Sequence, residues 1–303
     1  MNAPASDRPR AAGQVGLILL IGHDGQVGFE LQRALAPLGT VRAVCYPQID
    51  FAKPDDVRRI VREARPTLIV NAAAYTAVDK AEAEPELARQ LNAVAPGILA
   101  EEARRLGAGL VHYSTDFVFD GTRRTPYTEA DAPHPLSVYG QTKLEGDRAV
   151  QASGADYLIF RLAWVYGLRG KNFLLTVRRL ATEGKAIRVV QDQVGCPTWC
   201  RPVAEATAAA LARVMAPGAP CSLRAVSGIY NAVCGGATSW FGFARAILPP
   251  SVPVTAIGTE EYPTPARRPA YSVLDCSKLQ ATFGVSLPPW ETALRQCLKS
   301  AEA

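Results

Sequence analysis

The sequence predicts an α/β protein with a doubly wound parallel sheet, followed by a smaller α+β domain. Apolar runs of strand length alternate with helical patterns in the first half, and a glycine turn joins the first run to the first helix. Beyond about residue 170, prolines, glycines and short elements dominate. Strands alternating with helices are typical of a parallel sheet covered on both faces. We therefore expect a nucleotide-binding domain over 15–170 and a mainly substrate-binding domain over 171–303, part of which can return to the first domain.

The composition, with 48% hydrophobic and 20% charged residues, is that of an ordinary soluble globular protein. The net charge of +5 is spread without a basic run, which argues against nucleic acid and suits an anionic substrate. Residues 1–14 are polar and predict a disordered extension. The apolar run 15–21 is too short for a bilayer and no small-residue cleavage site follows it, so we expect neither a membrane partner nor a signal peptide.

Cysteine and histidine usage indicates a reducing compartment. Seven cysteines occur at irregular spacing without a Cys-x-x-Cys pair, and the three histidines are scattered. This pattern predicts reduced thiols and a cytoplasmic protein. The histidines lack the spacing of a metal-ligand cluster.

The first strand and helix enclose a glycine motif. The apolar run 15–21 reads as a strand buried on both faces, and 29–38 reads as an amphipathic helix. Between them lies Gly22-x-x-Gly25-x-x-Gly28, whose glycines allow a tight turn, close approach to a pyrophosphate and tight helix packing. The spacing differs from the commoner Gly-x-Gly-x-x-Gly, and a turn without a ligand is the alternative. The residues assigned to a dinucleotide (Rossmann) site here are Gly22, Gly25, Gln26 and Val27.

The second predicted strand, 41–45, bears on cofactor choice. Chains that select NAD usually carry an Asp or Glu about 20 residues after the glycine turn, on the ribose 2′-hydroxyl. Here that place holds Cys45-Tyr46, with Arg42 nearby and no carboxylate before Asp50. The sequence therefore favours NADPH, with NADH as the alternative, and Asp50 and Phe51 are assigned to the cofactor site.

Later strand ends converge on one crevice. The third strand, 66–71, ends in the small residues Ala72, Ala73 and Ala74, which are assigned to the cofactor. The fourth strand, 109–114, ends at Ser114-Thr115, and the fifth, 157–162, runs toward Trp164. Ligands of doubly wound sheets bind at the carboxyl ends of the strands. The other expected elements are helices 55–64, 85–106, 138–150 and 202–215 and a short strand 228–233.

Tyr139 and Lys143 are the candidate proton donor and its partner. They lie four residues apart in a predicted helix, so both side chains project from one face. A free phenol has a pKa near ~10, and a nearby ammonium lowers it toward the working range. A hydroxyl of Ser114 or Thr115 opposite the tyrosine can bind a carbonyl oxygen. Taken singly, each feature also fits an ordinary helix or a capping turn.

Together these motifs resemble the extended short-chain dehydrogenase/reductase family. Longer strings, among them 70–82, 111–116, 138–144 and 192–198, resemble a member that acts on nucleotide sugars, and the resemblance runs from about residue 15 to 298. It implies that NADPH reduces the C4 ketone of a dTDP-6-deoxy-4-ketohexose. Tyr139 then supplies the proton, Lys143 holds the ribose and tunes Tyr139, and Thr115 binds the carbonyl side.

The resemblance also implies substrate contacts and weighs against a metal. Trp164 packs on the sugar, while Arg268 and the loop from Asp192 and Gln193 to Thr198 face the nucleotide; plain core is the alternative for Trp164. Some relatives bind Mg²⁺ between subunits through a glutamate just after that loop. Cys200-Arg201 occupies that place here, so Mg²⁺ is doubtful and a monomer or weak homodimer is expected.

Two other functions remain open. Nucleotide-sugar dehydratases and epimerases share the motifs, but dehydratases tend to carry an Asp-Glu pair after the threonine, where this chain has Asp116-Phe117. A non-catalytic NADP-binding regulatory subunit is the alternative from a different class.

Overall fold

A six-stranded parallel sheet forms the centre of the computed structural model, which describes residues 15–215 and 221–301. Its strands are β1 (Val15–Ile21), β2 (Gly39–Val44), β3 (Leu68–Asn71), β4 (Gly109–Thr115), β5 (Asp156–Leu162) and β10 (Gly228–Asn231). Their order is β10-β5-β4-β3-β1-β2, with every neighbouring pair parallel. The predicted doubly wound fold is confirmed. The strand order reverses beside β1, where such sheets bind ligands.

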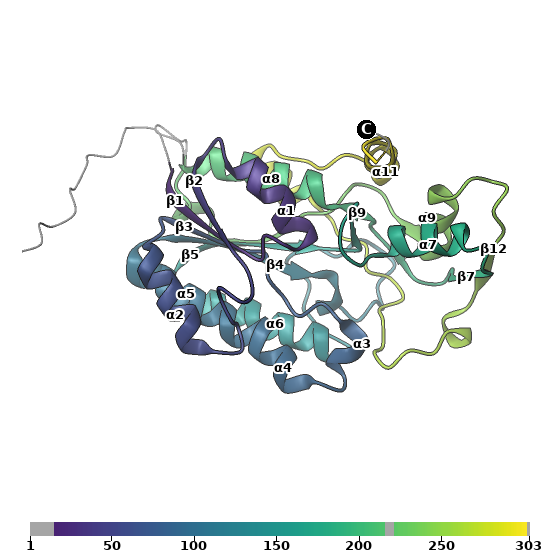
Figure 1. Cartoon of the computed structure of the whole chain (residues 1–303), viewed down its shortest axis with the longest axis horizontal. Coiled ribbons are helices and arrows are strands. Elements are labelled where there is room, and N and C mark those ends of the chain that lie inside the picture. The colour runs from purple at the N-terminus through teal and green to yellow at the C-terminus, as the bar shows by residue number, and fades with distance from the viewer. Residues whose placement is uncertain (1–14, 216–220, 302–303) are drawn as a thin grey trace, which may run out of the picture.

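Helices cover both faces of this sheet (Figure 1). One face carries α1 (Gln26–Leu35) and α8 (Cys200–Met215), and the other carries α2 (Pro54–Ala64), α5 (Ala95–Leu106) and α6 (Val138–Ala152). Successive strand residues point to opposite faces. Ile18 and Leu20 of β1 therefore join the core beneath α1 and α8, while Leu19 and Ile21 join the core against α2 and α5. The uninterrupted apolar run of β1 follows from burial on both sides.

Several elements differ from the sequence expectations. Helix α1 begins at Gln26, not at 29, because the turn leads into the helix directly after its N-cap, Gly25. The helix expected over 85–106 contains a π-helical segment, Gln90–Val94, between α4 (Pro85–Arg89) and α5. Such an insertion shifts the helix register locally. The third strand begins at Leu68 and the strand expected over 228–233 ends at Asn231.

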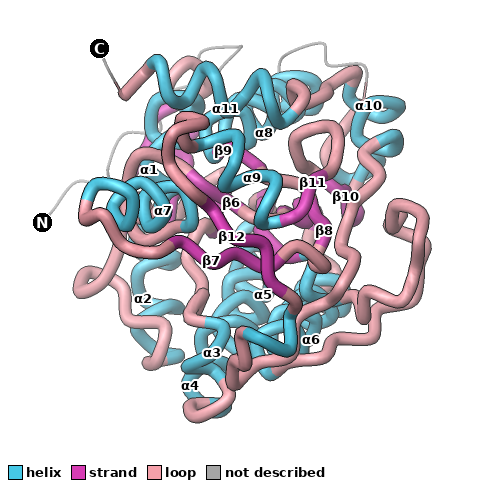
Figure 2. Tube along the Cα trace, turned by 90° about the vertical axis from the view of Figure 1, so that its right-hand side faces the viewer, coloured by secondary structure: helices cyan, strands magenta, loops and turns pink. Residues whose placement is uncertain are grey.

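The chain beyond residue 170 contributes to two regions. Strand β10 lies at the edge of the central sheet beside β5, and α8 packs against α1. Much of the remainder forms a lobe of short elements at one end of the molecule, including α7 (Phe173–Thr182), α9 (Trp240–Ile247), and the parallel pair β7 (Ile187–Val190) and β12 (Val254–Ile257) (Figure 2). The other elements are α3 (Val78–Ala81), β6 (Val165–Tyr166), β8 (Val194–Gly195), β9 (Thr198–Trp199), β11 (Thr238–Ser239), α10 (Ser277–Phe283) and α11 (Trp290–Lys299). Within the described residues, every helix is too short or too polar to cross a membrane.

Candidate active site

The glycine turn after β1 packs directly against the end of β3. Gly22 has a φ of +80°, and a β-carbon on it would lie 2.7 Å from the nitrogen of Ala73. A β-carbon on Gly28 would lie 2.0 Å from the Gly22 carbonyl oxygen. Gly25 caps α1 without a side-chain hydrogen bond, which leaves backbone N–H groups of the first turn available to an anion. The turn therefore has the shape and the donors of a pyrophosphate site.

Two other residues assigned to the cofactor are tied to distant segments. The Gln26 side-chain oxygen accepts a 2.8 Å hydrogen bond from Asn172, which also caps α7 by accepting from Leu175 N–H at 3.0 Å. The buried Phe51 accepts at its carbonyl from the Gln90 side chain at 3.3 Å. These bonds fix the turn and the loop after β2 relative to the lobe and to the π segment.

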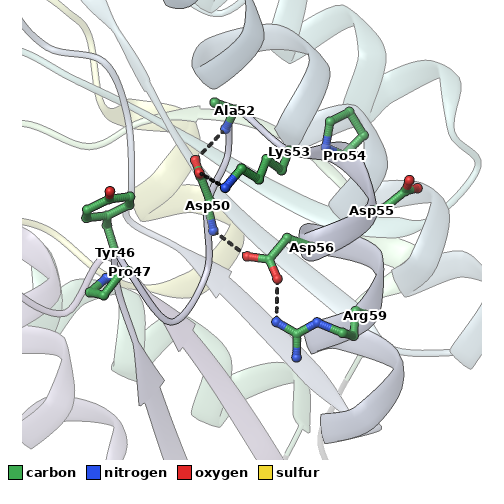
Figure 3. A pocket seen from close by; sticks show the side chains of 9 residues that line it. All are labelled: Tyr46, Pro47, Asp50, Ala52, Lys53, Pro54, Asp55, Asp56 and Arg59. Atoms are coloured by element: carbon green, nitrogen blue, oxygen red, sulfur yellow. Dashed lines mark hydrogen bonds and ion pairs between the residues drawn. The ribbon is translucent and has the colours of Figure 1, made fainter.

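A cavity of about 690 Å³ lies between the end of β2 and the start of α2 (Figure 3). Asp50 forms a 3.3 Å ion pair with Lys53 and accepts a 3.0 Å hydrogen bond from Ala52 N–H. Asp56 accepts from Asp50 N–H at 2.7 Å and pairs with Arg59. The two cations at this edge of the sheet are thus already balanced by carboxylates.

Helix α6 is anchored so that Tyr139 stands beside the end of β4. The Ser137 hydroxyl caps the helix by accepting from Gly140 N–H at 3.2 Å, and Glu82 accepts from Val138 N–H at 2.8 Å. A β-carbon on Gly140 would lie 2.2 Å from the Phe117 carbonyl oxygen, so only glycine allows this approach. Tyr139 makes an edge contact with the Phe117 ring, with centroids 5.6 Å apart.

Tyr139 and Thr115 face each other as the sequence predicts, but the pKa of the phenol differs from the expectation. Burial raises the pKa of Tyr139 to about 12, and the Thr115 hydroxyl opposes this only in part. The expectation that Lys143 lowers this pKa is not met. The reason is that burial dominates, while the Lys143 ammonium group points toward β4. Tyr139 therefore keeps its proton through the neutral pH range.

Lys143 lies below the tyrosine, almost wholly buried. Its Nζ donates to the Tyr113 carbonyl at 2.5 Å and lies 3.3 Å from His112 Nε2. Burial lowers the pKa of Lys143 to about 8, against the opposing charge of Asp147. This lysine is therefore able to change its charge near neutral pH.

Ser114 and Thr115 project to opposite sides of β4, because strand side chains alternate. The Ser114 hydroxyl donates to Asp147 at 2.7 Å inside the protein, so it does not share Thr115's position opposite Tyr139. Asp147 also lies 3.8 Å from Arg161, and both side chains are buried. Sequence reasoning missed Asp147, although it follows Lys143 by four residues and so shares its helix face.

Replacing Asp147 with alanine is expected to destabilise the fold by about 3–5 kcal/mol, because it leaves the Arg161 charge buried without a partner. Urea unfolding followed by circular dichroism measures the change. Glu145→Ala, which removes a partly exposed partner of Arg89 two residues earlier in the same helix, is the control and should change stability by at most about 1 kcal/mol. Equal effects of the two substitutions would contradict the interpretation.

Trp164 occupies a strained backbone position just after β5. Its φ is +46°, a conformation rare for a bulky side chain and often found at functional sites. Its ring stacks on Trp240 with centroids 3.5 Å apart, and the bare backbone of Gly195 lies against it. The side chain is partly exposed, and its buried part packs against the hydrophobic cluster that contains Cys196 and Val233.

The residues expected to face a nucleotide are paired with other protein groups. Arg268 donates to Asp79 through both terminal nitrogens, at 3.1 and 2.8 Å, and so joins the C-terminal half to α3. Asp192 accepts from Thr259 N–H at 3.0 Å, and Gln193 donates to the Thr259 hydroxyl at 3.1 Å. Sequence reasoning missed Asp79 and Thr259. The distances in sequence, 189 and 67 residues, explain why.

Just after the loop 192–198, where the resemblance raised the question of a metal ligand, the chain carries a paired cation. Arg201 forms a 3.1 Å ion pair with Glu30 of α1 and stacks over Trp199. Over residues 15–215 and 221–301, no three histidine, cysteine, aspartate or glutamate side chains form a group suited to a metal ion.

The parallel sheet, the glycine turn at its switch point and the Thr115, Tyr139 and Lys143 cluster define a nucleotide-dependent reductase of the extended short-chain class. The chain belongs to the family described as RmlD substrate binding domain, whose model matches residues 16–303. Over 293 residues it is 46% identical to dTDP-4-dehydrorhamnose reductase of Burkholderia thailandensis, covering 93% of this chain and 98% of that protein. It is 39% identical to a probable dTDP-4,6-dihydroxy-2-methyloxan-3-one 4-ketoreductase of Streptomyces antibioticus, covering 92% and 93%.

A solved structure agrees with this assignment. The dTDP-4-dehydrorhamnose reductase of Bacillus anthracis, crystallised in complex with NADP, superimposes with a TM-score of 0.85 at 33% identity, covering 95% of this chain and 99% of that one. The family expected from the sequence motifs is confirmed.

Proposed function

We propose that this protein is a dTDP-4-dehydrorhamnose reductase, which uses NADPH to reduce the C4 ketone of dTDP-4-dehydro-6-deoxy-L-mannose to dTDP-L-rhamnose. The observation that carries the proposal is the meeting of Thr115 and Tyr139 at the end of β4, with Lys143 buried directly below. Relatives 40–46% identical over more than nine-tenths of the chain bear this name.

Each residue of the cluster has one task in the reaction. The Thr115 hydroxyl and the Tyr139 phenol both bind the ketone oxygen, which gains negative charge as the carbon is reduced. Tyr139 then passes its proton to that oxygen. The Lys143 ammonium would hold the ribose of the cofactor and so keep the nicotinamide beside this pair. Trp164 and Arg268 bind the sugar and the diphosphate, which requires Arg268 to share or exchange its bond to Asp79.

The glycine turn fits a dinucleotide cofactor, because Gly22 and Gly28 leave no room for side chains and the first turn of α1 offers free donors. Residues Gly22, Gly25, Gln26 and Val27 would hold the diphosphate, and Ala72, Ala73 and Ala74 would line the bound molecule. When bound, NADPH supplies the hydride, which no side chain can provide. Seven free cysteines suit a cytoplasmic enzyme.

Turnover of NADPH with the purified keto sugar tests the function and separates it from the alternatives. A reductase oxidises NADPH in proportion to product. An epimerase would interconvert nucleotide sugars without net oxidation, and a regulatory subunit would bind NADPH without turnover. The keto sugar named in the Streptomyces relative is the comparison substrate, and a higher kcat/KM on it would move the assignment to that substrate.

NADPH is expected to support the reaction at least as well as NADH, because the second strand is followed by Cys45-Tyr46 where chains that select NAD usually carry a carboxylate. Comparison of kcat/KM for the two cofactors measures the preference. A preference for NADH greater than about tenfold, equal to ~1.4 kcal/mol, would overturn this expectation.

Chelation is expected to leave both activity and mass in solution unchanged, because Arg201, paired with Glu30, stands where the resemblance gives some relatives an acidic metal ligand. We propose a monomer or a weak homodimer. Light scattering and turnover with and without EDTA test this, and dissociation of a dimer by EDTA would count against it.

A further inference from the structure

A buried histidine lies between the end of β3 and the catalytic helix. His112 of β4 is 1% exposed and is the register partner of Asn71 on β3. Its Nδ1 lies 3.1 Å from the Asn71 side-chain nitrogen, and its Nε2 lies 3.3 Å from Lys143 Nζ. Both ring nitrogens therefore face groups that ordinarily donate hydrogen bonds. A neutral imidazole has only one accepting nitrogen, so it cannot accept from both groups.

The backbone of Ala73 determines which nitrogen carries the ring proton. Ala73 N–H donates to Asn71 Oδ1 at 3.1 Å, and a backbone N–H can only donate. Asn71 must therefore present its NH₂ group to His112, since the reversed amide would set two donors against each other. His112 Nδ1 then accepts, and the single proton of the neutral ring lies on Nε2.

A proton on Nε2 has a consequence for Lys143. If Lys143 is an ammonium, two donors face each other in a buried site, where an unmade bond is expensive. If Lys143 is an amine, its lone pair accepts from Nε2–H and one of its own hydrogens still donates to the Tyr113 carbonyl. The bonds then run in one direction from Ala73 through Asn71, His112 and Lys143 to Tyr113.

The surrounding charges are few. Asp147 of α6 favours the ammonium form of Lys143 and is itself offset by Arg161 of β5. Burial and the neighbouring Lys143 lower the pKa of His112 well below its usual range, so the imidazole is neutral. Tyr139, one turn from Lys143 on the same helix, is also uncharged at neutral pH.

We propose that His112 is a positioning residue, held by Asn71 as the Nε2–H tautomer, and that it donates to Lys143 and favours the amine over the ammonium. A hydrogen bond to the neutral form opposes protonation, so His112 keeps the charge change of Lys143 near the working pH. The role in turnover depends on the proposed reductase function, whereas the tautomer does not.

Nitrogen NMR of the imidazole rings tests the tautomer directly, because the chain has only three histidines. Long-range ¹H–¹⁵N correlation at pH 7 should show His112 with a protonated Nε2 and an unprotonated Nδ1, with no titration of the ring between pH 5.5 and 8.5. The signals that vanish in His112→Gln identify the residue. A protonated Nδ1 or an imidazolium at His112 would overturn the proposal.

Asn71→Asp is expected to reverse the direction of the hydrogen bonds between residue 71, His112 and Lys143. The carboxylate accepts from both Ala73 N–H and His112, which moves the ring proton to Nδ1 and turns Nε2 into an acceptor for the Lys143 ammonium. The falling limb of kcat at high pH should then move upward by at least about one pH unit. Gln151→Glu, with the same charge change on the exposed surface of α6, is the control and should leave the limb in place.

The outcomes of the two experiments are distinct. A tautomer switch without a shift of the pH limb would show that His112 does not control Lys143 and would refute the proposal. If the protein shows the expected tautomers but reduces no keto sugar, the reductase function is refuted. The inferred directions of the hydrogen bonds from Ala73 to Tyr113 are then unaffected.

Discussion

Replacing Tyr139 with phenylalanine is expected to lower kcat on the keto sugar by about 10²–10⁴-fold, the usual contribution of general acid catalysis. The substitution removes one hydroxyl and keeps the ring that contacts Phe117. With a pKa raised to about 12, the phenol is fully protonated at neutral pH and is available as an acid throughout that range. Stopped-flow turnover gives kcat, and quenching of intrinsic fluorescence by NADPH shows whether the cofactor still binds.

The matched control for this substitution is Tyr230→Phe. It removes a hydroxyl that donates to the Val226 carbonyl at 2.6 Å, at the edge of the sheet formed by β10. This variant should keep kcat near that of the parent protein. If Tyr139→Phe turned over as fast as the control, the assignment of Tyr139 as proton donor would be wrong.

The parts of the fold and site that the sequence predicted depend on short stretches of chain. A strand, a glycine turn and a helix can be recognised within about fifteen residues, because close backbone contacts in the turn leave no room for side chains. Gly22 and Gly28 both make such contacts. Tyr139 and Lys143 were found in the same way, since one helical turn sets their relation. The ends of parallel strands necessarily share one edge of the sheet, which places Thr115 at the same edge as the glycine turn.

Other features depend on segments that meet only after folding. The hydrogen bonds between Arg268 and Asp79 join residues 189 positions apart, and no local sequence pattern predicts them. The pKa of Tyr139 rises because distant segments bury it, an effect that outweighs the nearby lysine considered from the sequence alone. Two features were within reach of local rules. Strand alternation already separates Ser114 from Thr115, and helix spacing already places Asp147 beside Lys143.

The π segment of the helix before β4 is a further case. Asn92 within it accepts from Tyr75 N–H at 2.9 Å and donates to the Thr142 hydroxyl of α6 at 3.2 Å. A β-carbon on Gly146 would lie 2.1 Å from the Asn92 carbonyl oxygen. The π turn therefore lies in close contact with α6 and helps to position that helix. Side-chain periodicity alone predicted a single uninterrupted helix here.

Lys143→Met is expected to lower kcat by about 10²-fold, because a cofactor that Lys143 no longer holds is misplaced relative to Tyr139. NADPH affinity should fall as well, because Lys143 is assigned to the ribose. Methionine retains the length of the buried side chain, so the loss is chiefly of the charged group.

The pH dependence of the remaining activity separates this explanation from simple loss of packing. Burial lowers the pKa of Lys143 to about 8, so the ammonium form dominates below that pH and is lost as pH rises through it. The parent protein should therefore lose activity as pH rises through about 8, with Lys143 as the titrating group. In Lys143→Met this limb should disappear and the residual activity should extend to higher pH, limited only by Tyr139, whose pKa is about 12. Lys278→Met, which removes an ammonium that donates to the Ile229 carbonyl at the far edge of the sheet, should keep the parent profile. The same falling limb near pH 8 in Lys143→Met would show that another group titrates there.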